Sequence, residues 1–233
     1  MQTLRAIQAQ ARETILYEAQ SVKNLADFID DDFAQSVQLI YNSTGRVIIT
    51  GVGKSAIIAQ KIVATLNSTG TPAVFMHAAD AIHGDLGIIQ DDDIALCLSR
   101  SGDTPEIKVL VPLIKRFGNR LIAMVSKTNS YLAKQADFVL KATIEREACP
   151  NNLAPTTSTT AQIVIGDALA VSLLRMRSFT SEDYAKYHPG GSLGKKLYLK
   201  VKDLYVNNFK PKVYLDDMLE KVIVEISSKL LGA

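Results

Sequence analysis

The sequence predicts an α/β fold, a three-layer sandwich in which helices cover both faces of a five-stranded parallel sheet. Short apolar runs alternate with amphipathic helical stretches, which indicates βαβ units and strands that are buried on both sides. The distinctive polar motifs follow these runs directly, at the carboxyl ends of strands, where ligands gather in such sheets. The predicted strands are 46–51, 72–77, 93–99, 120–126 and 137–142.

Two helices are predicted ahead of the first strand. Apolar residues recur at steps of three and four over residues 3–29, so this stretch is expected to form one long amphipathic helix. A leading helix of this kind commonly packs on a neighbouring element or on a second copy of the chain. A second helix over 31–42 follows the aspartates at 30–32, whose charges suit the positive end of a helix dipole.

Helical patterns also occupy the stretches between and after the strands. A long helix begins after residue 156, and a short one follows in TSEDYAKYH, with Thr180 or Ser181 as its cap. Pro189-Gly190-Gly191 ends the short helix, and the last part of the chain holds one further helical pattern. The helices between strands are expected over 55–68, 104–117 and 129–136.

The composition excludes several classes of protein. The chain has 233 residues, of which 47% are hydrophobic, and this suits one good-sized domain or one domain plus a fragment. A net charge of +2, from 26 basic and 24 acidic residues with no basic block, argues against nucleic-acid binding through a large positive face. The polar N-terminus lacks a signal-peptide core, and no uninterrupted apolar stretch approaches the roughly 18 residues of a membrane span. A soluble, cytoplasmic protein with no nucleic-acid or membrane partner is therefore expected.

The stretch VIITGVGKSA predicts a strand, a tight turn and a helix start that suit an anion. A nucleotide P-loop would need a glycine five positions before Gly53, where Ile48 stands. A dinucleotide site would need an acid at the end of the next strand, where His77 stands. What remains is a site for an anion smaller than a nucleotide, made by N–H groups at the helix start with Lys54 and Ser55 beside them.

SRSGDTPEI is a second candidate phosphate site. Ser99, Ser101 and Thr104 cluster where the third strand meets its helix, and their hydroxyls can bind a phosphate together with first-turn N–H groups. The alternative is an ordinary helix cap in which Glu106 completes a capping box. Because a similar turn ends the neighbouring strand, the phosphate site is favoured.

Three histidines lie near these motifs. His77 ends a predicted strand and is expected to be a satisfied, partly buried ring. His83 lies in a polar, Gly-containing loop on the ligand side, and His188 precedes a rigid turn that suits the presentation of a side chain. Asp80 or Asp85 would be needed to complete a metal site with the first two, and the spacing does not favour structural zinc. No metal is expected beyond a weak candidate site at His83.

Glu147 and the cysteines have plain interpretations. Glu147, in EREACP, is a charged residue beside Cys149-Pro150, and surface exposure is its alternative to a functional role. Cys97 lies inside an apolar run and is expected to be a small buried thiol. Two cysteines cannot build a disulfide framework.

Together these motifs resemble the D-arabinose-5-phosphate isomerases. The similarity rests on GVGKS, STGTPAVFMHAADAIHGDLG, SRSGDTPEI, EACPNNLAPTTSTT with GDALAV, and FTSEDYAKYHPGGSLGKKL. The family consists of sugar isomerase (SIS) domain proteins of the pathway to 3-deoxy-D-manno-octulosonate (Kdo), with a flavodoxin-like or Rossmann-like fold. The resemblance implies an SIS domain over 1–200, and over 201–233 a linker and the truncated beginning of a CBS domain.

The resemblance implies a reversible aldose–ketose isomerisation between D-ribulose 5-phosphate and D-arabinose 5-phosphate through an enediol(ate), without a cofactor. Such a reaction needs a general base at carbon, an acid for the carbonyl oxygen and a ring-opening group. Lys54, Glu106, Glu147 and His188 match the family's functional set. The hypothesis is that Glu147 or Glu106 is the carbon base, that His188 opens the ring or moves protons between oxygens, and that Lys54 stabilises the enediolate or the substrate.

The resemblance also implies the substrate-binding residues. Gly53 and Ser55 belong to the first turn, the hydroxyls of SRSGDTPEI to the second, and His83 is a further pocket residue. The threonines near 156–160 are expected to close the pocket. Arg100, between the two serines of SRSGDTPEI, departs mildly from the family pattern. The full substrate-binding set is Gly53, Ser55, His83, Ser99, Ser101, Thr104, Thr156 and Thr157.

The resemblance further implies a homo-oligomer, a tetramer with sites shared between subunits, in which His188 enters a neighbour's pocket. CMP-Kdo is a candidate feedback ligand. Two alternatives stay open: an isomerase of another phosphosugar, and a non-catalytic sugar-phosphate sensor. A sensor would normally carry a DNA-binding domain, and the N-terminal helices are too short and too weakly basic for one.

Overall fold

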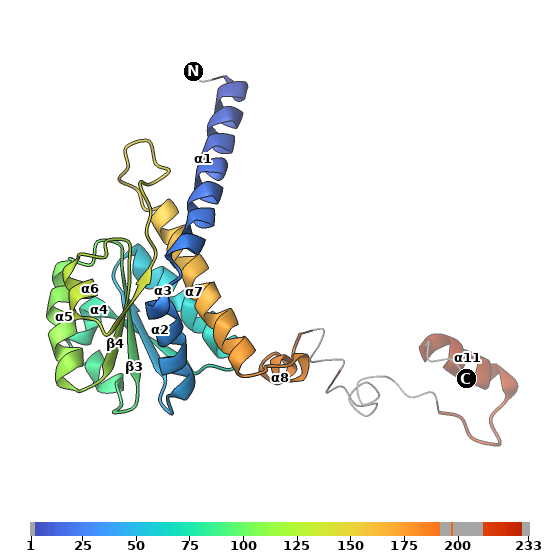
Figure 1. The fold of residues 1–233 in the computed structure, drawn as a ribbon. Helices are drawn as coiled ribbons and strands as arrows, with labels where there is room; N and C mark the ends of the chain where they lie inside the picture. Colours follow the sequence, from blue (N-terminus) through green and yellow to red (C-terminus); the bar gives the residue numbers. More distant parts are fainter. Residues whose placement is uncertain (1–2, 192–196, 198–211, 230–233) are drawn as a thin grey trace. The chain divides into compact units, whose positions relative to one another are not determined.

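The computed structural model describes residues 3–191, 197 and 212–229. The chain divides into two units, Met1–Phe179 and Thr180–Ala233, each of which is described by itself. The first unit holds the sheet and the helices around it (Figure 1).

A five-stranded sheet forms the centre of the first unit, with the order β2-β1-β3-β4-β5 and parallel pairing throughout. Each strand begins and ends within a residue of the predicted run, so the predicted strands and the α/β class are confirmed. The chain moves from β1 to β2 on one side and then to β3 on the other, which places a crevice at the carboxyl ends of β1 and β3. The strands are β1 (Val47–Gly51), β2 (Ala73–His77), β3 (Ile94–Ser99), β4 (Arg120–Val125) and β5 (Phe138–Lys141).

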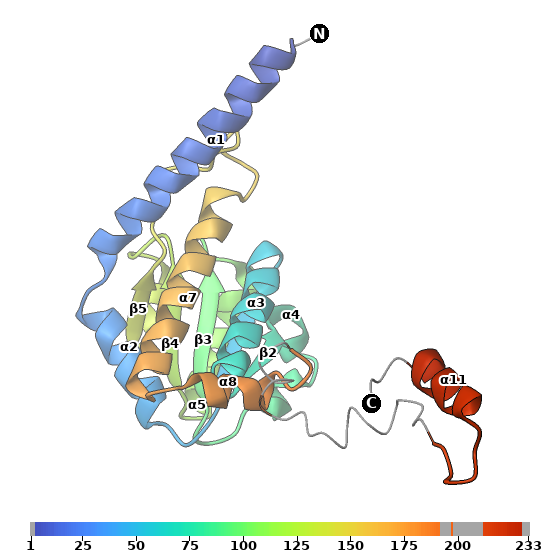
Figure 2. The same cartoon turned by 90° about the vertical axis from the view of Figure 1, so that its right-hand side faces the viewer.

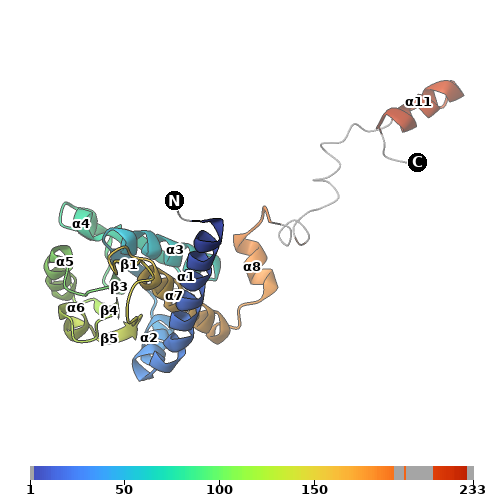
Figure 3. The same ribbon diagram turned by 90° about the horizontal axis from the view of Figure 1, so that it is seen from above.

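Helices cover both faces of this sheet, as the predicted three-layer sandwich requires. Figure 3 shows α4, α5 and α6 on one side of the strands, and α2, α3 and α7 on the other. Alternate strand residues explain the two layers: Ile49 points to the core under α3 and α7, whereas Ile48 points to the core under α5. The helices are α2 (Asp31–Asn42), α3 (Lys54–Ser68), α4 (Ala78–Ala81), α5 (Pro105–Arg116), α6 (Tyr131–Gln135) and α7 (Thr157–Met176).

The leading helix α1 (Leu4–Asn24) projects away from the sandwich (Figures 1 and 2). A single 3-10 turn, η1 (Leu25–Phe28), follows it, so the predicted helix over 3–29 is confirmed with a tighter last turn. No residue of α1 is buried, because only its C-terminal part meets α7 and the loop before it. The apolar stripe read from the sequence is therefore largely exposed in the single chain.

α7 is the one helix within the described ranges that is long and apolar enough to span a membrane. The sequence predicted no such stretch, because polar residues interrupt every apolar run. Half of the apolar window is buried in the protein, and Ile165, Leu169 and Leu173 belong to the core beneath the sheet. These contacts give α7 the packing of a core helix.

The described part of the second unit includes the helices α8 (Ser181–Tyr187) and α11 (Leu219–Lys229). Thr180 caps α8 through a capping box with Asp183, which settles the choice between Thr180 and Ser181. The predicted linker and beginning of a CBS domain over 201–233 falls partly on 201–211 and 230–233, which lie outside the described residues. The proposed boundary at residue 200 stays a prediction.

Candidate active site

The turn between β1 and α3 brings backbone N–H groups to the crevice. Gly53 has φ 58° and ψ −127°, a conformation that side chains rarely adopt, and it is the N-cap of α3. A Cβ on Gly51 would lie 3.1–3.2 Å from the backbone of Ser55, Ala56 and Leu98, so the close packing of this turn on β3 favours glycine. Lys54 and Ser55 are thereby placed in the first turn of α3.

In the turn between β3 and α5, two serine hydroxyls accept hydrogen bonds from backbone N–H groups of the same turn. Ser99 Oγ accepts a hydrogen bond from the Gly102 N–H at 3.0 Å, and Ser101 Oγ accepts one from the Asp103 N–H at 3.3 Å. Thr104 is the N-cap of α5, but its hydroxyl makes no capping bond and is buried without a partner among the described residues. The predicted alternative, an ordinary cap with a capping box to Glu106, is therefore wrong.

A cavity of about 270 Å³ lies between these two turns. It holds most of the residues that the sequence assigned to phosphate binding, and it adds residues from the start of α7. A hydroxyl that is buried without a partner, such as that of Thr104, is available to a ligand. The lining consists of Val52, Lys54, Ser55, Leu98, Ser99, Arg100, Ser101, Thr104, Pro155, Ser158 and Thr159.

Three helices begin at this cavity: α3, α5 and α7 each contribute first-turn or cap residues to its lining. The N-terminus of each helix carries unpaired N–H groups and the positive end of the helix dipole. Gln162, buried in α7, joins two of these helices, since its side-chain amide lies 3.3 Å from Ser55 Oγ. The convergence gives the cavity the geometry that suits an anion, with the cation Lys54 in its lining.

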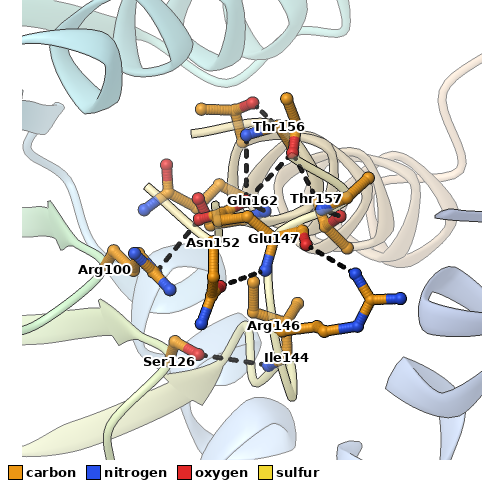
Figure 4. A network of polar contacts seen from close by, with 12 residues as sticks. Arg100, Ser126, Ile144, Arg146, Glu147, Asn152, Thr156, Thr157 and Gln162 are labelled. Carbon is orange, nitrogen blue, oxygen red and sulfur yellow. Dashed lines mark hydrogen bonds and ion pairs between the residues drawn. The ribbon is translucent and has the colours of Figure 1, made fainter. Parts of the chain in front are cut away.

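Glu147 is buried beside the start of α7, in the loop that follows β5 (Figure 4). Its Oε2 accepts hydrogen bonds from the N–H groups of Thr156 at 2.9 Å and Ser158 at 3.0 Å. Arg100 Nε lies 3.1 Å from Oε1, but Oε1 makes no hydrogen bond within the described residues. The side chain of Glu147 is 0% exposed, so the alternative interpretation, surface exposure, is wrong.

The environment of Glu147 favours the ionised carboxylate. Burial by itself would raise the pKa of this group, but hydrogen bonds from Ser158 and Thr156 and the charge of Arg100 together lower the pKa below its usual value. Glu147 is therefore a carboxylate at neutral pH, held at one oxygen and, among the described residues, free of hydrogen bonds at the other.

Thr156 and Thr157 hold the Glu147 loop instead of facing the cavity. Their hydroxyls accept hydrogen bonds from the Ala148 N–H at 3.1 Å and 2.9 Å (Figure 4). The sequence assigned these two threonines to substrate binding, whereas the residues of the same run that line the cavity are Ser158 and Thr159. The TTSTT pattern located the helix start correctly but not which hydroxyls face inward.

Three further residues singled out in the sequence, Glu106, His83 and His77, lie outside the cavity lining. Glu106 is half-buried in the first turn of α5 and is not part of the lining. His83 is exposed in the turn after α4 and is also outside the lining. His77 is partly buried as expected, but it is not satisfied: its Nδ1 lies 3.5 Å from Asp80 Oδ2 and makes no hydrogen bond to any described residue. In the described part of the chain, no three His, Cys, Asp or Glu side chains gather as metal ligands would.

His188 belongs to the second unit, where it ends α8. Its Nδ1 lies 2.9 Å from the carbonyl oxygen of Tyr184, and its ring stacks on the Tyr184 ring with centroids 3.8 Å apart. A carbonyl oxygen can only accept, so among the tautomers of a neutral ring this contact favours the one with the proton on Nδ1 and a lone pair on Nε2. This tautomer suits a group that exchanges protons at Nε2.

Sequence reasoning missed Gln162 and Ser158 as parts of the site, named Thr159 only within the threonines near 156–160, and noted Arg100 only as a mild departure. The helical spacing from Ser158 to Gln162 places both on one face of α7, a signal that the sequence contained. The contact between Arg100 and Glu147 depends on how the loop after β5 folds, and no local sequence pattern predicts that contact.

Comparison with known proteins agrees with this geometry. The SIS domain family model matches residues 39–172. Arabinose 5-phosphate isomerase KdsD of Pseudomonas aeruginosa is 49% identical over 223 residues, which cover 95% of this chain and 68% of the relative. Arabinose 5-phosphate isomerase KpsF of Escherichia coli is 48% identical over 222 residues, 95% of this chain and 70% of the relative.

A solved structure of a related protein is also similar to this chain. A protein of Escherichia coli CFT073 in complex with arabinose 5-phosphate superposes with a TM-score of 0.78 at 36% sequence identity, over 81% of this chain and 100% of that chain. The resemblance inferred from the motifs is confirmed by both kinds of comparison. The chain belongs to the arabinose-5-phosphate isomerases of the SIS domain family.

Proposed function

We propose that this chain interconverts D-ribulose 5-phosphate and D-arabinose 5-phosphate in the cavity between the starts of α3, α5 and α7. The observation that carries the proposal is the convergence of three helix N-termini on a cavity with a buried hydroxyl, that of Thr104, which has no partner among the described residues. The curated relatives named above are arabinose 5-phosphate isomerases, which supports the same substrate.

The phosphate of the substrate would bind against the helix starts. Ser55, Ser99, Ser101 and Thr104 supply hydroxyls there, and the first-turn N–H groups supply further donors. Gly53 contributes by its backbone alone, since it has no side chain to obstruct the approach. Many neutral donors with a lysine nearby bind a dianion without a large positive surface, consistent with the net charge of +2.

The chemistry requires one carboxylate to take a proton from C1 of the ketose. A proton then moves from the oxygen at C1 to the oxygen at C2, and a proton returned to C2 gives the aldose. Neither Glu147 nor Glu106 belongs to the cavity lining, but Glu147 contacts two residues that do, Arg100 and Ser158. Glu147 suits the base better than Glu106, because backbone hydrogen bonds to its Oε2 fix the carboxylate there. A positioned base contributes roughly 10²–10⁴-fold to rate.

Lys54 and His188 complete the proposed machinery. Lys54 lines the cavity, where its charge would stabilise the enediolate, and one good donor of this kind is worth roughly 10²–10³-fold. His188, with its lone pair at Nε2, would open the sugar ring or move protons between oxygens. His83 is proposed as a further pocket residue, contributed within an assembly of several chains.

We also propose a homotetramer with sites shared between subunits. α1 supports self-association, because its apolar side chains Leu4, Ile7, Ile15 and Leu16 are 80%, 51%, 67% and 69% exposed in the single chain. If His188 enters a neighbour's pocket, mixing the inactive variants Lys54→Met and His188→Ala restores part of the activity. No recovery would place the site within one chain.

The pathway assignment follows the family. Arabinose 5-phosphate formed here would enter Kdo synthesis for lipopolysaccharide or capsule, in the cytoplasm, with CMP-Kdo as a feedback ligand. Titration with CMP-Kdo during turnover tests the last point, and unchanged rates would remove it.

The test of the activity itself is a substrate panel read by NMR. Purified protein should convert ribulose 5-phosphate to arabinose 5-phosphate, and Glu147→Gln and Lys54→Met should each lose most of this activity while remaining folded at the assay temperature. Full activity in both variants would remove the catalytic assignment. Turnover of a hexose or heptose phosphate instead would favour an isomerase of another phosphosugar, and tight binding without turnover would favour a sensor.

A further inference from the structure

Arg100 occupies an unusual position in the cavity. It stands between the two serines of the β3–α5 turn, lines the cavity, and places its Nε 3.1 Å from Oε1 of Glu147 (Figure 4). Its own side chain is 40% exposed, whereas that of Glu147 is 0% exposed. One side of Arg100 thus meets a buried charge and the other meets the space that the substrate would occupy.

We propose that Arg100 is a positioning residue of the isomerisation, whose charge at Oε1 holds the Glu147 carboxylate ionised and in place beside the cavity. This inference rests on the proposed function, and it assigns a task to a residue that touches the base and not the reacting carbon.

The two oxygens of Glu147 are treated differently by their surroundings. Oε2 accepts from the Thr156 N–H, the Ser158 N–H and, at 3.3 Å, the Thr156 hydroxyl. Oε1 is buried and accepts no hydrogen bond from any described residue, although Arg100 Nε approaches it. Because a buried carboxylate without a counter-charge is costly, Arg100 supplies the compensation at Oε1. It does so by charge, without a well-aligned hydrogen bond that would occupy the oxygen.

Arg100 also lines a second cavity. This cavity, of about 230 Å³, shares Arg100 and Ser101 with the substrate cavity. Truncation of Arg100 would remove part of the wall common to both. Lys127 lines the second cavity but not the first, and so provides a matched cation outside the substrate cavity.

Other charged groups near Glu147 must be considered in any pH dependence. They come from α1, the start of α3, the segment after β4 and the Glu147 loop, and Arg100 is the one that forms an ion pair with the carboxylate among the described residues. Arg146 instead donates to the backbone oxygen of Glu147 at 3.2 Å, and Glu18 accepts from Thr160. These groups are Glu18, Lys54, Lys127, Glu145, Arg146 and the Cys149 thiol.

The test measures kcat and KM for ribulose 5-phosphate as a function of pH in Arg100→Gln, Arg100→Lys and Lys127→Gln. Arg100→Gln should lower kcat by about 10- to 100-fold with a smaller change in KM. The acidic limb of the kcat profile of Arg100→Gln should move to higher pH, because loss of the neighbouring positive charge raises the pKa of the Glu147 carboxyl. Arg100→Lys should restore the limb but not the whole of kcat, and Lys127→Gln should behave as wild type.

The outcomes separate this inference from the proposed function. Full activity in Glu147→Gln would overturn the role of Glu147 and with it the inference. If Glu147→Gln is inactive while Arg100→Gln keeps the wild-type kcat and acidic limb, the Arg100 proposal alone is overturned. Arg100→Gln could also lose kcat while the acidic limb stays at the wild-type pH, with Arg100→Lys recovering no more kcat than Arg100→Gln. That result would mean a merely structural role for Arg100 and would also overturn the proposal. Should Arg100→Gln not fold, Arg100→Lys decides: a wild-type limb with reduced kcat supports the proposal, and wild-type kcat contradicts it.

Discussion

Asp93 offers a sharp test of how the sheet is held together at the end opposite the cavity. Its side chain is 1% exposed and precedes β3, where it accepts hydrogen bonds from the Arg46 N–H at 2.8 Å, from Arg46 Nη2 at 2.7 Å and from the Gln90 N–H at 2.9 Å. Asp93 thus ties the beginnings of β1 and β3 together. Asp93→Asn keeps the shape of the side chain but turns a nitrogen donor toward groups that are themselves donors.

The expected loss of stability in Asp93→Asn is large, because the positive charge of Arg46 remains without its partner. Removing one member of a buried pair costs about 3–5 kcal/mol. A domain of this size loses about 2–4 °C in melting temperature for each kcal/mol, so the melting temperature should fall by about 6–20 °C. The matched control is Asp167→Asn: Asp167 pairs with Lys61, and their side chains are 45% and 40% exposed. An exposed pair contributes roughly 0–1 kcal/mol, so this variant should melt near wild type.

Thermal melting followed by far-UV circular dichroism at several pH values is the assay. Burial raises the pKa of Asp93, but the Arg46 and Gln90 hydrogen bonds and the Arg46 charge more than offset this, so the net pKa is lowered. A lowered pKa in the folded state means that this stabilisation is present at neutral pH and lost as the pH falls through the folded-state value. Wild type should therefore lose more stability on acidification than Asp93→Asn. Equal melting of Asp93→Asn and the Asp167→Asn control at pH 7 would refute the reasoning.

Three further predictions follow from single contacts. Thr104→Val should raise KM for the sugar phosphate by about 10-fold with little change in kcat, since its buried hydroxyl is free for the phosphate, and an unchanged KM in steady-state kinetics would contradict this. Iodoacetamide should label Cys149 and spare Cys97 in the folded protein, as measured by mass spectrometry. Burial raises the pKa of Cys97 to about 12, whereas backbone N–H groups of the Cys149 loop lower the pKa of the Cys149 thiol. Equal labelling of both thiols would count against this. Gly166→Ala should lower the melting temperature, because the added Cβ would lie 2.5 Å from Cγ1 of buried Ile62. The overpacking costs about 1–3 kcal/mol and outweighs the ~1 kcal/mol that alanine gains in helix propensity. A higher melting temperature would contradict this.

The fold was predictable because its signals are local. Val47 to Gly51 are all buried, and a strand covered on both faces gives a nearly continuous apolar run, here Val47 to Ile49 followed by Thr50 and Gly51. Thr180 and Asp183 likewise announce the start of α8 within four residues. The exposure of α1 was not predictable, since an amphipathic pattern does not say whether the surface that covers it lies in the same chain.

The site was predictable where it depends on strand ends. Lys54, Ser99 and Thr104 lie in the cavity because parallel strands bring their carboxyl ends to one edge. Glu147 was the difficult residue: EREACP is polar, and its burial arises only when the loop after β5 folds over the start of α7. The hydroxyl of Thr156 accepts a hydrogen bond from that same loop, which explains why the sequence could not tell which part of TTSTT faces the cavity.

Proton exchange during turnover tests the central claim most directly. Ribulose 5-phosphate is incubated with the protein in D₂O and followed by ¹H and ³¹P NMR, with Glu147→Gln as the control. The account predicts arabinose 5-phosphate that carries deuterium at C2, and a rate at least about 10²-fold lower in the control. No arabinose 5-phosphate above the protein-free reaction, or equal rates for the wild type and Glu147→Gln, would contradict it.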